Sequence, residues 1–208
     1  MAGTESNSPA ALKASRRKRG AARKTGAQAA ARDLICGAAL KLFAEGGFNA
    51  VSMRTIAQEL GVSAMMPYSY FPSKDHLLLE LRTRGFQRLA DALRIARLNG
   101  LDARDAFEAV CIAYIEFAED EPGSYRLMFD YWALESEAVG DTEFREASVR
   151  QSGSLAELRE AVIALNPACD PDIEAPVVWA SLHGFASLML TRQIGRGRAY
   201  DRLVPPMV

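Results

Sequence analysis

Hydrophobic residues recur at three- and four-residue spacing along most of the chain, which places them on one face of an α-helix. A Gly46–Gly47 pair follows the first such face, and glycine readily adopts the left-handed backbone conformation that ends a helix. The pattern therefore predicts a helix over about residues 29–45. Its apolar face consists of Ile35, Ala38, Ala39, Leu42 and Phe43.

A second, shorter helix is predicted over residues 52–60. Ser52 can cap its first turn, because a serine oxygen accepts a hydrogen bond from a backbone N–H that has no partner within the helix. Gly61 then permits a sharp turn, after which we expect Val62 to be buried beneath the neighbouring helices. The apolar face of this helix consists of Ile56, Ala57 and Leu60.

A third short helix is predicted from a cap at Ser63 to about Phe71, where Pro72 interrupts the pattern. Pro67 lies inside this segment, although proline has no N–H to donate and its ring clashes with the preceding turn. Either a start one residue later or a tighter first turn would accommodate Pro67.

The rest of the chain also has helical periodicity. A long helix is expected from Ser73 to about Leu98, one from Gly140 to Leu165, and a last one that ends near Gly195. No run of useful length alternates apolar and polar residues as a strand does. The predicted fold is therefore all-α, with about nine helices in a three-helix N-terminal helix-turn-helix domain and a C-terminal helical bundle. Further helix starts are expected near Asp102, Pro122 and Asp170.

The composition of the 208-residue chain, with 49% apolar and 25% charged residues, is that of a globular protein and excludes a wholly disordered one. Charge is distributed unevenly: residues 1–98 carry 16 Lys and Arg against seven Asp and Glu, whereas residues 99–208 carry nine against 19. The positive excess in the first half points to a polyanionic partner.

Residues 1–28 contain no aromatic residue, Ile or Val, and they include the run Arg16-Arg17-Lys18-Arg19. Because such a segment buries little apolar surface, we expect a flexible basic tail. This tail either only aids solubility or contacts phosphates.

The strongest motif is SMRTIAQELGVSAMMPYSYFPSK, residues 52–74. Two short helices joined by a sharp turn expose the second one, whose first residues can then enter the major groove of DNA. With AALKLFAEGGF before it and HLLLEL after it, the segment resembles the DNA-binding domain of the tetracycline-repressor (TetR) family over residues 29–81. It departs from the family pattern at Leu60, at Met65–Met66 and at Pro67, where the family has small residues and then leucine.

The resemblance implies DNA-binding roles for residues at the starts of the second and third helices, some toward phosphates and others toward base edges. The positions expected in the groove are small or apolar, which favours contacts to thymine methyl groups over bidentate hydrogen bonds. Met65 and Met66 can instead pack between helices, and Tyr68 can belong to the core or to the groove. The implied residues are Ser52, Arg54, Ser63, Ala64, Met65, Met66, Tyr68, Ser69, Tyr70 and Lys74.

Aromatic residues accumulate in the second half of the chain. The segment VVWASLHGFASLML, residues 177–190, resembles the C-terminal ligand domain of a TetR subgroup marked by a Trp and a His-Gly pair (WHG), here Trp179, His183 and Gly184, and YRLMF at 125–129 fits the same subgroup. The resemblance implies a pocket for a small hydrophobic effector, but these aromatics can also form solid core, with His183 as a structural histidine. The implied pocket residues are Phe107, Tyr114, Tyr125, Met128, Phe129, Trp132, Trp179 and His183.

The TetR resemblance also implies a homodimer through the last two long helices, and a two-fold dimer suits a palindromic operator in double-stranded DNA. We therefore expect a tail over 1–28, a DNA-binding domain over 29–74, and an effector-binding and dimerisation domain over 75–208. The apolar residues expected at the dimer contact are Leu155, Leu158, Val162, Val178, Leu182, Phe185, Leu188 and Met189.

No signal peptide or uninterrupted membrane span is apparent, so we expect a cytoplasmic protein without a membrane partner. The two histidines and three cysteines are widely separated, and neither HExxH nor GxSxG occurs, so no metal, no cofactor and no enzymatic activity are expected. The expected function is a transcriptional regulator, with repression relieved by a ligand as the usual behaviour of the family. The alternatives are an architectural DNA-binding protein without an effector and a helical enzyme with an incidental helix-turn-helix.

Overall fold

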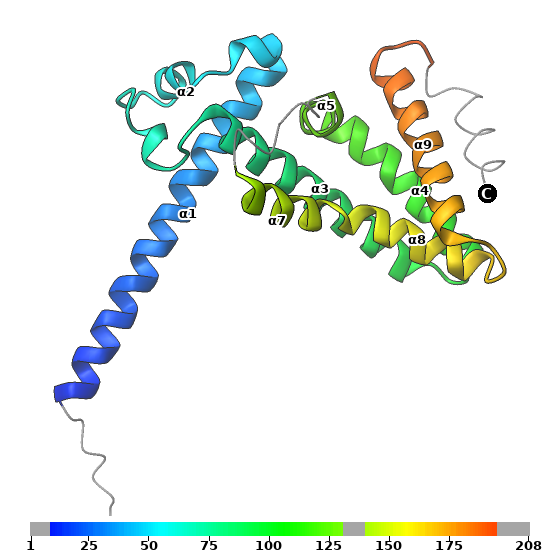
Figure 1. Cartoon of the computed structure of the whole chain (residues 1–208), viewed down its shortest axis with the longest axis horizontal. Helices are drawn as coiled ribbons and strands as arrows, with labels where there is room; N and C mark the ends of the chain where they lie inside the picture. The colour runs from blue at the N-terminus through cyan, green and yellow to red at the C-terminus, as the bar shows by residue number, and fades with distance from the viewer. Residues whose placement is uncertain (1–8, 131–139, 195–208) are drawn as a thin grey trace, which may run out of the picture. The chain divides into compact units, whose positions relative to one another are not determined.

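A computed structural model describes the backbone of residues 9–130 and 140–194, and the side chains of residues 26–129 and 140–194. Every regular element in these described ranges is helical, which confirms the predicted all-α fold (Figure 1). The chain divides into two compact units, one ending at Pro72 and the other beginning at Ser73. The sequence placed this division two residues later, after Lys74.

The first unit contains α1 (Pro9–Ala50), α2 (Met53–Glu59) and the short 3-10 helix η1 (Pro67–Ser69). Helix α1 begins at Pro9, so the backbone of residues 9–28, where the sequence predicted a flexible tail, is helical. This segment is rich in Ala, Lys and Arg, which are strong helix formers, and it extends a helix whose later turns are packed. Low apolar content alone therefore did not decide its backbone conformation.

Glycines interrupt the helices of this unit where the sequence predicted turns. Gly47 has φ 67° and ψ −163° inside the range of α1, and Gly61 has φ 65° directly after α2. Val62, however, has 39% of its surface exposed, so the prediction that it is buried is wrong. The turn fixes only the backbone of Val62, whose N–H donates to the Ala57 carbonyl at 3.0 Å.

The predicted third helix is replaced by a turn over residues 64–66 and by η1. Pro67 cannot donate a hydrogen bond to the Ser63 carbonyl, which instead accepts from the Met66 N–H at 2.9 Å. The following N–H groups of Ser69 and Tyr70 also bond three residues back, which is the tighter 3-10 pattern. Of the two ways to accommodate Pro67, the chain adopts the tighter turn, and the Ser63 side chain caps no helix.

The second unit is built around the long helix α3 (Lys74–Asn99), which packs against α4, α5, α7 and α8. The predicted apolar side of α3 is confirmed, since Leu78, Leu81, Leu89 and Leu93 are all buried. Helix α9 completes the core by packing against α4 and α8. The other helices are α4 (Ala103–Asp120), α5 (Pro122–Asp130), α7 (Asp141–Gln151), α8 (Gly153–Leu165) and α9 (Pro171–Leu190).

Two predicted helix boundaries in this unit are wrong. The helix expected over residues 140–165 is divided at Ser152, whose N–H is shared between the Ser148 and Val149 carbonyls and whose hydroxyl donates to Val149. This tight turn ends α7, and α8 begins with the next residue. The last helix ends at Leu190 rather than near Gly195, with Arg192 at φ 59° in the turn that follows.

Candidate DNA-binding and ligand sites

Helix α2 and the turn after it are held by a local network of hydrogen bonds. The Ser52 hydroxyl accepts from the Thr55 N–H at 3.0 Å, and the Thr55 hydroxyl accepts from the Ser52 N–H at 2.8 Å, which forms a capping box. Ser52 was predicted as a phosphate contact, and its hydroxyl is engaged in this cap. Arg54, the second residue of α2, is exposed.

The residues predicted to enter the DNA groove project mostly into solvent. Met65 is 70% exposed and Tyr68 48% exposed, so Tyr68 does not belong to the core of this unit. Met66 is half-buried, and the Ser69 hydroxyl donates to the Met65 carbonyl at 3.4 Å. The small residues Ser63, Ala64 and Ser69 are also exposed, which leaves room around the two large apolar side chains.

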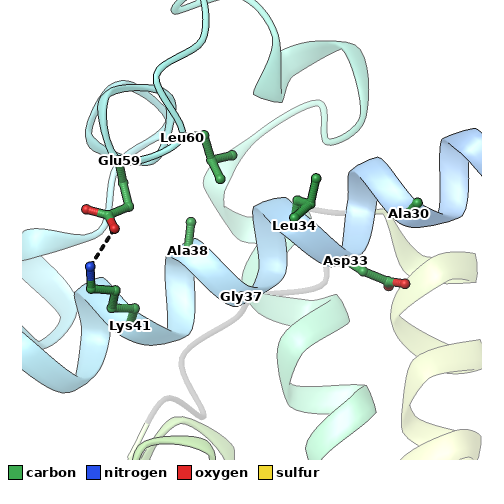
Figure 2. A pocket seen from close by; sticks show the side chains of 8 residues that line it. All are labelled: Ala30, Asp33, Leu34, Gly37, Ala38, Lys41, Glu59 and Leu60. Atoms are coloured by element: carbon green, nitrogen blue, oxygen red, sulfur yellow. Dashed lines mark hydrogen bonds and ion pairs between the residues drawn. The ribbon is translucent and has the colours of Figure 1, made fainter.

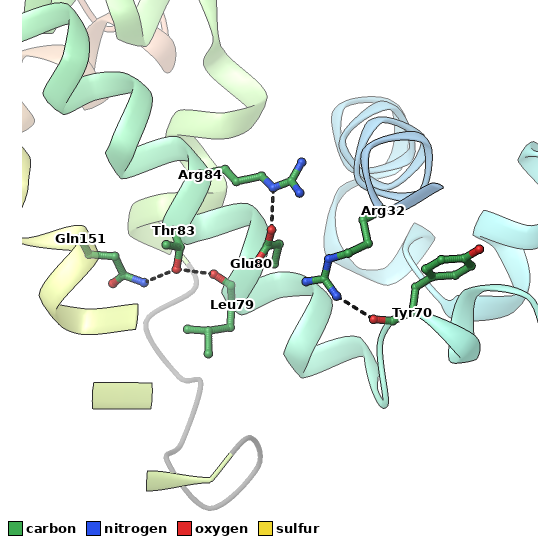
Figure 3. Close-up of polar contacts among 7 residues, drawn as sticks. All are labelled: Arg32, Tyr70, Leu79, Glu80, Thr83, Arg84 and Gln151. Atoms are coloured by element: carbon green, nitrogen blue, oxygen red, sulfur yellow. Dashed lines mark hydrogen bonds and ion pairs between the residues drawn. The ribbon is translucent and has the colours of Figure 1, made fainter. Parts of the chain in front are cut away.

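Arg32 stabilises this turn from α1 and was missed by sequence reasoning. Its guanidinium donates to the Tyr70 carbonyl at 2.8 Å (Figure 3). The same guanidinium lies 4.1 Å from the centre of the Phe71 ring, and Phe71 is fully buried. No local pattern pairs residues that are 38 positions apart, so only tertiary packing identifies this contact. Tyr70 itself is half-buried.

Lys74, the tenth predicted DNA contact, belongs to the second unit, where it is the first residue of α3. It is half-buried, and burial lowers the pKa of its ammonium group, although neighbouring Asp75 opposes this shift. Ser73 caps the helix at this point, since its hydroxyl accepts from the His76 N–H at 3.4 Å. Lys74 is therefore held at a capped helix start.

A separate hollow of about 610 Å³ lies between α1 and the end of α2 (Figure 2). Lys41 on α1 donates to Glu59 on α2 at 2.6 Å, and the hydrogen bond and charge of Glu59 raise the pKa of Lys41. None of the predicted DNA-binding residues lines this hollow. Its lining consists of Ala30, Asp33, Leu34, Gly37, Ala38, Lys41, Glu59 and Leu60.

In the second unit, three predicted ligand residues form a hydrogen-bonded chain. The Tyr114 and Tyr125 hydroxyls lie 3.2 Å apart, and the Tyr125 hydroxyl lies 2.7 Å from His183 Nδ1. Both tyrosines are almost fully buried, and burial strongly raises the pKa of the Tyr114 hydroxyl. A neutral hydroxyl in this core therefore uses its polarity for hydrogen bonds and not for ionisation.

Aromatic contacts extend this chain into a cluster. The Phe129 ring lies 4.3 Å from the His183 ring and 6.2 Å from Trp179, measured between ring centres, and Trp179 lies 5.3 Å from Tyr114. Phe86 of α3, which sequence reasoning missed, lies 5.4 Å from Phe129. These rings form one cluster of edge-to-face and tilted contacts that joins α3, α4, α5 and α9.

The remaining predicted ligand residues lie elsewhere. Met128 is buried and packs against Gly85 of α3, and Phe107 is buried two helical turns before Tyr114 on α4. Trp132 lies outside the described residues. The structure therefore brings five of the predicted residues together and leaves Met128 and Phe107 in the surrounding core.

A cavity of about 350 Å³ adjoins the aromatic cluster, and Trp179 is the one predicted ligand residue on its wall within the described part of the chain. It lies among α3, the junction of α7 with α8, and α9. The wall contains both polar and apolar side chains. The lining consists of Arg82, Phe86, Ser148, Gln151, Ser152, Ser154, Leu155, Pro176 and Trp179.

Across the described ranges, no group of three or more His, Cys, Asp or Glu side chains could hold a metal ion. Cys36 and Cys111 are buried, and burial raises the pKa of Cys111 to about 12. Such a thiol stays protonated and unreactive near neutral pH.

Comparison with known proteins relates the chain to bacterial regulators. It is 33% identical over 93 residues to the HTH-type transcriptional activator FasR of Mycolicibacterium smegmatis, which covers 45% of this chain and 42% of FasR. It is 43% identical over 63 residues to the HTH-type transcriptional repressor KstR of Rhodococcus jostii, which covers 30% of each protein. The chain thus matches less than half the length of each of these relatives.

The same likeness extends to solved structures and family models. A protein of unknown function from Rhodococcus sp. RHA1 superposes with a TM-score of 0.71 at 26% identity, covering 85% of this chain and 90% of that one. Residues 35–81 match the model of bacterial regulatory proteins of the tetR family, and residues 107–208 match a tetracyclin repressor-like C-terminal domain. The first family model covers the capped helix-turn-helix, and the second covers most of the helical bundle that contains the aromatic cluster. The chain therefore belongs to the TetR family of bacterial regulatory proteins.

Proposed function

We propose that this protein is a cytoplasmic homodimeric transcriptional regulator that binds a palindromic operator in double-stranded DNA. The observation that carries this proposal is the turn after α2, which presents Met65 and Tyr68 to solvent beside exposed Arg54. These two side chains lie three residues apart on one turn, where a binding partner can cover both of them. Thymine methyl groups in the major groove are apolar contacts of suitable size.

The polar residues around this turn suit the DNA backbone. Arg54 and the basic run in the first half of the chain can contact phosphates, which set the register of the protein on the duplex. Each phosphate that the protein neutralises makes binding more sensitive to salt. The logarithm of the binding constant then falls more steeply with the logarithm of the salt concentration, by about 0.9 in slope per phosphate. We also propose Lys74, Ser52 and the other DNA-binding residues predicted from the sequence as contacts to DNA, because the family resemblance implies these positions.

The second unit is proposed to receive a small, largely hydrophobic ligand that alters operator binding. The cavity of about 350 Å³ falls within the usual size of ligand sites, and aromatic rings of Phe86 and Trp179 form part of its wall. Trp179 and His183 lie in the aromatic cluster of α9, and this arrangement supports the proposed membership of the WHG subgroup. The ligand must bind one conformation of the protein more tightly than the other, because equal affinity for two conformations would not change the equilibrium between them.

Helix α9 supports a dimer, although only part of the apolar set that the sequence suggested is exposed. Leu155 and Leu188 of that set are exposed. Leu158, Val162, Leu182, Phe185 and Met189 are buried in the core of their own chain and cannot form a dimer contact. A stripe of α9 at helical spacing is instead exposed, with apolar ends and small residues between them. The stripe consists of Ile173, Val177, Ala180, Ser181, Gly184 and Leu188.

The same helix is long and apolar enough, with a mean hydropathy of 1.3, to cross a membrane by those two criteria alone. One side of it packs in the bundle core, however, so a second copy of the chain is the simpler cover for the exposed stripe. Relatives include a named activator and a named repressor, and repression relieved by ligand is proposed as the usual behaviour of the family. An architectural DNA-binding protein without an effector is the second candidate.

The test is selection of bound duplexes from a random DNA pool at two salt concentrations. Wild-type protein is expected to enrich a palindrome, and Tyr68→Ala is expected to lose that enrichment because it removes an exposed groove contact. Val149→Ala, which truncates an exposed apolar residue of α7, serves as the matched control and keeps the palindrome. Binding that is salt-sensitive but indifferent to sequence would favour the architectural candidate.

A further inference from the structure

The wall of the cavity in the second unit combines aromatic and polar side chains. Phe86 and Trp179 are aromatic, whereas Arg82, Gln151 and Ser148 are polar. A purely hydrophobic ligand would remove water from these polar groups without replacing its hydrogen bonds. Burying polar groups without hydrogen-bond partners is unfavourable, so the wall favours a ligand with a polar end of its own.

Arg82 gives this wall a positive charge. It lies one helical turn before Phe86 on α3, with its guanidinium carbon 5.7 Å from the centre of the Phe86 ring. Arg82 is half-buried, and burial lowers the pKa of its guanidinium, although an arginine remains charged at neutral pH. A guanidinium has five N–H donors, so it can bind an anion in addition to the contacts it makes within the protein.

Gln151, the last residue of α7, is held in place beside this charge. Its side-chain N–H donates to the Thr83 hydroxyl oxygen at 3.2 Å, and the Thr83 hydroxyl donates to the Leu79 carbonyl at 2.8 Å (Figure 3). Because Thr83 commits its only proton to Leu79, the Gln151 amide must donate to it. The amide then has a second N–H that can donate to a ligand at the cavity wall.

We infer that the cavity binds a compact amphipathic anion, with its apolar body against Phe86 and Trp179 and its anionic group at Arg82 and Gln151. A volume of about 350 Å³ lies near the lower end of the range for ligand sites, which favours a short acid over a large cofactor. This inference rests on the proposed ligand response and narrows the class of ligand. Since Gln151 ends α7 and Thr83 lies on α3, an anion that engages Gln151 acts on the contact between these two helices.

The experiment compares anions with neutral molecules of the same shape by calorimetric titration of the full chain. The pairs are octanoate with octan-1-ol, and naphthalene-2-carboxylate with naphthalene-2-methanol. At least one anion is expected to bind about tenfold more tightly than its neutral counterpart, which is the effect of a charge-assisted hydrogen bond. If neither anion is preferred, including the case in which nothing binds, the inference is wrong.

Two variants assign the preference to the cavity. Arg82→Gln is expected to remove the preference for the anion while leaving the affinity for the neutral compound unchanged. Gln151→Glu is expected to weaken binding of the anion at least tenfold through like-charge repulsion. Arg94→Gln, an exposed arginine on the same helix away from the cavity, is the matched control and keeps the preference. Each variant is checked for an unchanged unfolding midpoint, and Gln151→Glu decides the result if Arg82→Gln does not fold. An anion preference that survives both variants overturns the inference.

Measuring the affinity for a selected operator duplex, with and without each compound, tests this inference and the proposed function separately. If the preferred anion binds through Arg82 but leaves DNA affinity unchanged, the cavity assignment stands and the proposed ligand response fails. If a neutral compound changes DNA affinity while neither anion is preferred, the ligand response stands and this inference fails.

Discussion

At the residue scale, backbone conformation at single positions decides how the DNA-binding unit turns. Gly61 has φ 65°, a conformation in which an added Cβ would strain the backbone even though it would meet no atom within 4 Å. Pro67 has the opposite effect, because its missing N–H removes one α-helical hydrogen bond and tightens the next turn. Together these two residues set the path that exposes Met65 and Tyr68.

Gly61→Ala is expected to lower the free energy of unfolding by about 1–2 kcal/mol, because alanine pays the steric penalty of the left-handed region. The measurement is urea unfolding of the full chain, followed by circular dichroism. Since a methyl group at Gly61 meets no neighbour, the loss would come from the backbone alone.

Gly37→Ala is the matched control. Gly37 lies within α1, and its added Cβ also meets no atom within 4 Å, but its backbone is helical. Alanine there is expected to raise the free energy of unfolding by about 0.5–1 kcal/mol. Equal effects of the two substitutions would show that backbone conformation at Gly61 does not limit the turn.

At the element scale, α3 is fixed to its neighbours by ion pairs that cross between helices. Arg88 Nε donates to both carboxylate oxygens of Glu121, at 3.0 and 3.1 Å. Arg88 Nη2 donates to Glu121 Oε2 at 2.6 Å and to the Ser124 hydroxyl at 3.0 Å, which joins α3 to the junction of α4 with α5. Arg97 pairs with Glu157 of α8 at 2.7 Å. His76 Nε2 lies 3.6 Å from Glu143 of α7. Burial alone would raise the pKa of Glu121, but the hydrogen bonds from Arg88 and Ser124 and the charge of Arg88 lower it overall.

Because the pKa of Glu121 is lower in the folded state than in the unfolded state, its contribution to stability is complete above the ordinary carboxylate range. That contribution is lost as the pH falls through the lowered pKa. Glu121→Gln is therefore expected to be less stable than wild type at pH 7 by about 0.5–1 kcal/mol, a value reduced by solvent screening of this partly exposed pair. The difference should shrink as urea unfolding is repeated toward pH 3.

Glu116→Gln provides the comparison for this prediction, since Glu116 is an exposed residue of α4. It should follow the wild-type pH dependence within error. A gap between wild type and Glu121→Gln that is the same at pH 7 and pH 3 would contradict an ionic origin of the stabilisation.

At the scale of the whole molecule, the proposed dimer depends on the exposed stripe of α9. Ile173 is 60% exposed, Val177 56% and Leu188 41%, and Gly184 lies between the last two. An added Cβ at Gly184 would meet no atom within 4 Å of its own chain. A side chain that begins at this position therefore starts in open space, where it would obstruct a close approach by a second helix.

Gly184→Leu and Leu188→Glu are each expected to weaken dimerisation at least tenfold, the first by steric exclusion and the second by burying a charge at an apolar contact. Sedimentation velocity over a range of protein concentrations measures this change. The unfolding midpoint of the monomer should not fall below that of the parent chain, and Gly184→Leu can raise it because leucine favours a helix more than glycine does.

Leu101→Glu is the control for surface charge, because Leu101 is 95% exposed and lies outside α9. It should sediment as wild type does. If Gly184→Leu and Leu188→Glu also sediment as wild type does, the dimer uses another surface and the proposed stripe is wrong.

The sequence by itself determined the all-α fold, because helical periodicity, serine and aspartate caps and glycine turns act within a few residues of one another. Ser52, Ser73, Asp102 and Asp170 cap their helices as the local pattern indicates. The motif around Gly61 also identified the family, since it depends on residue types at fixed spacing. These features require no knowledge of what lies across the core.

Only the tertiary structure decided which apolar residues face the core and which face solvent. Periodicity alone did not distinguish the buried side of α9 from its exposed stripe, because both sides of this helix are apolar. The contacts of Arg32 with Tyr70, of Phe86 with Phe129 and of Gln151 with Thr83 join residues far apart in the chain. Such pairs, and the cavity that Arg82 and Trp179 line, exist only once the helices pack, because packing geometry and not local preference brings these side chains together.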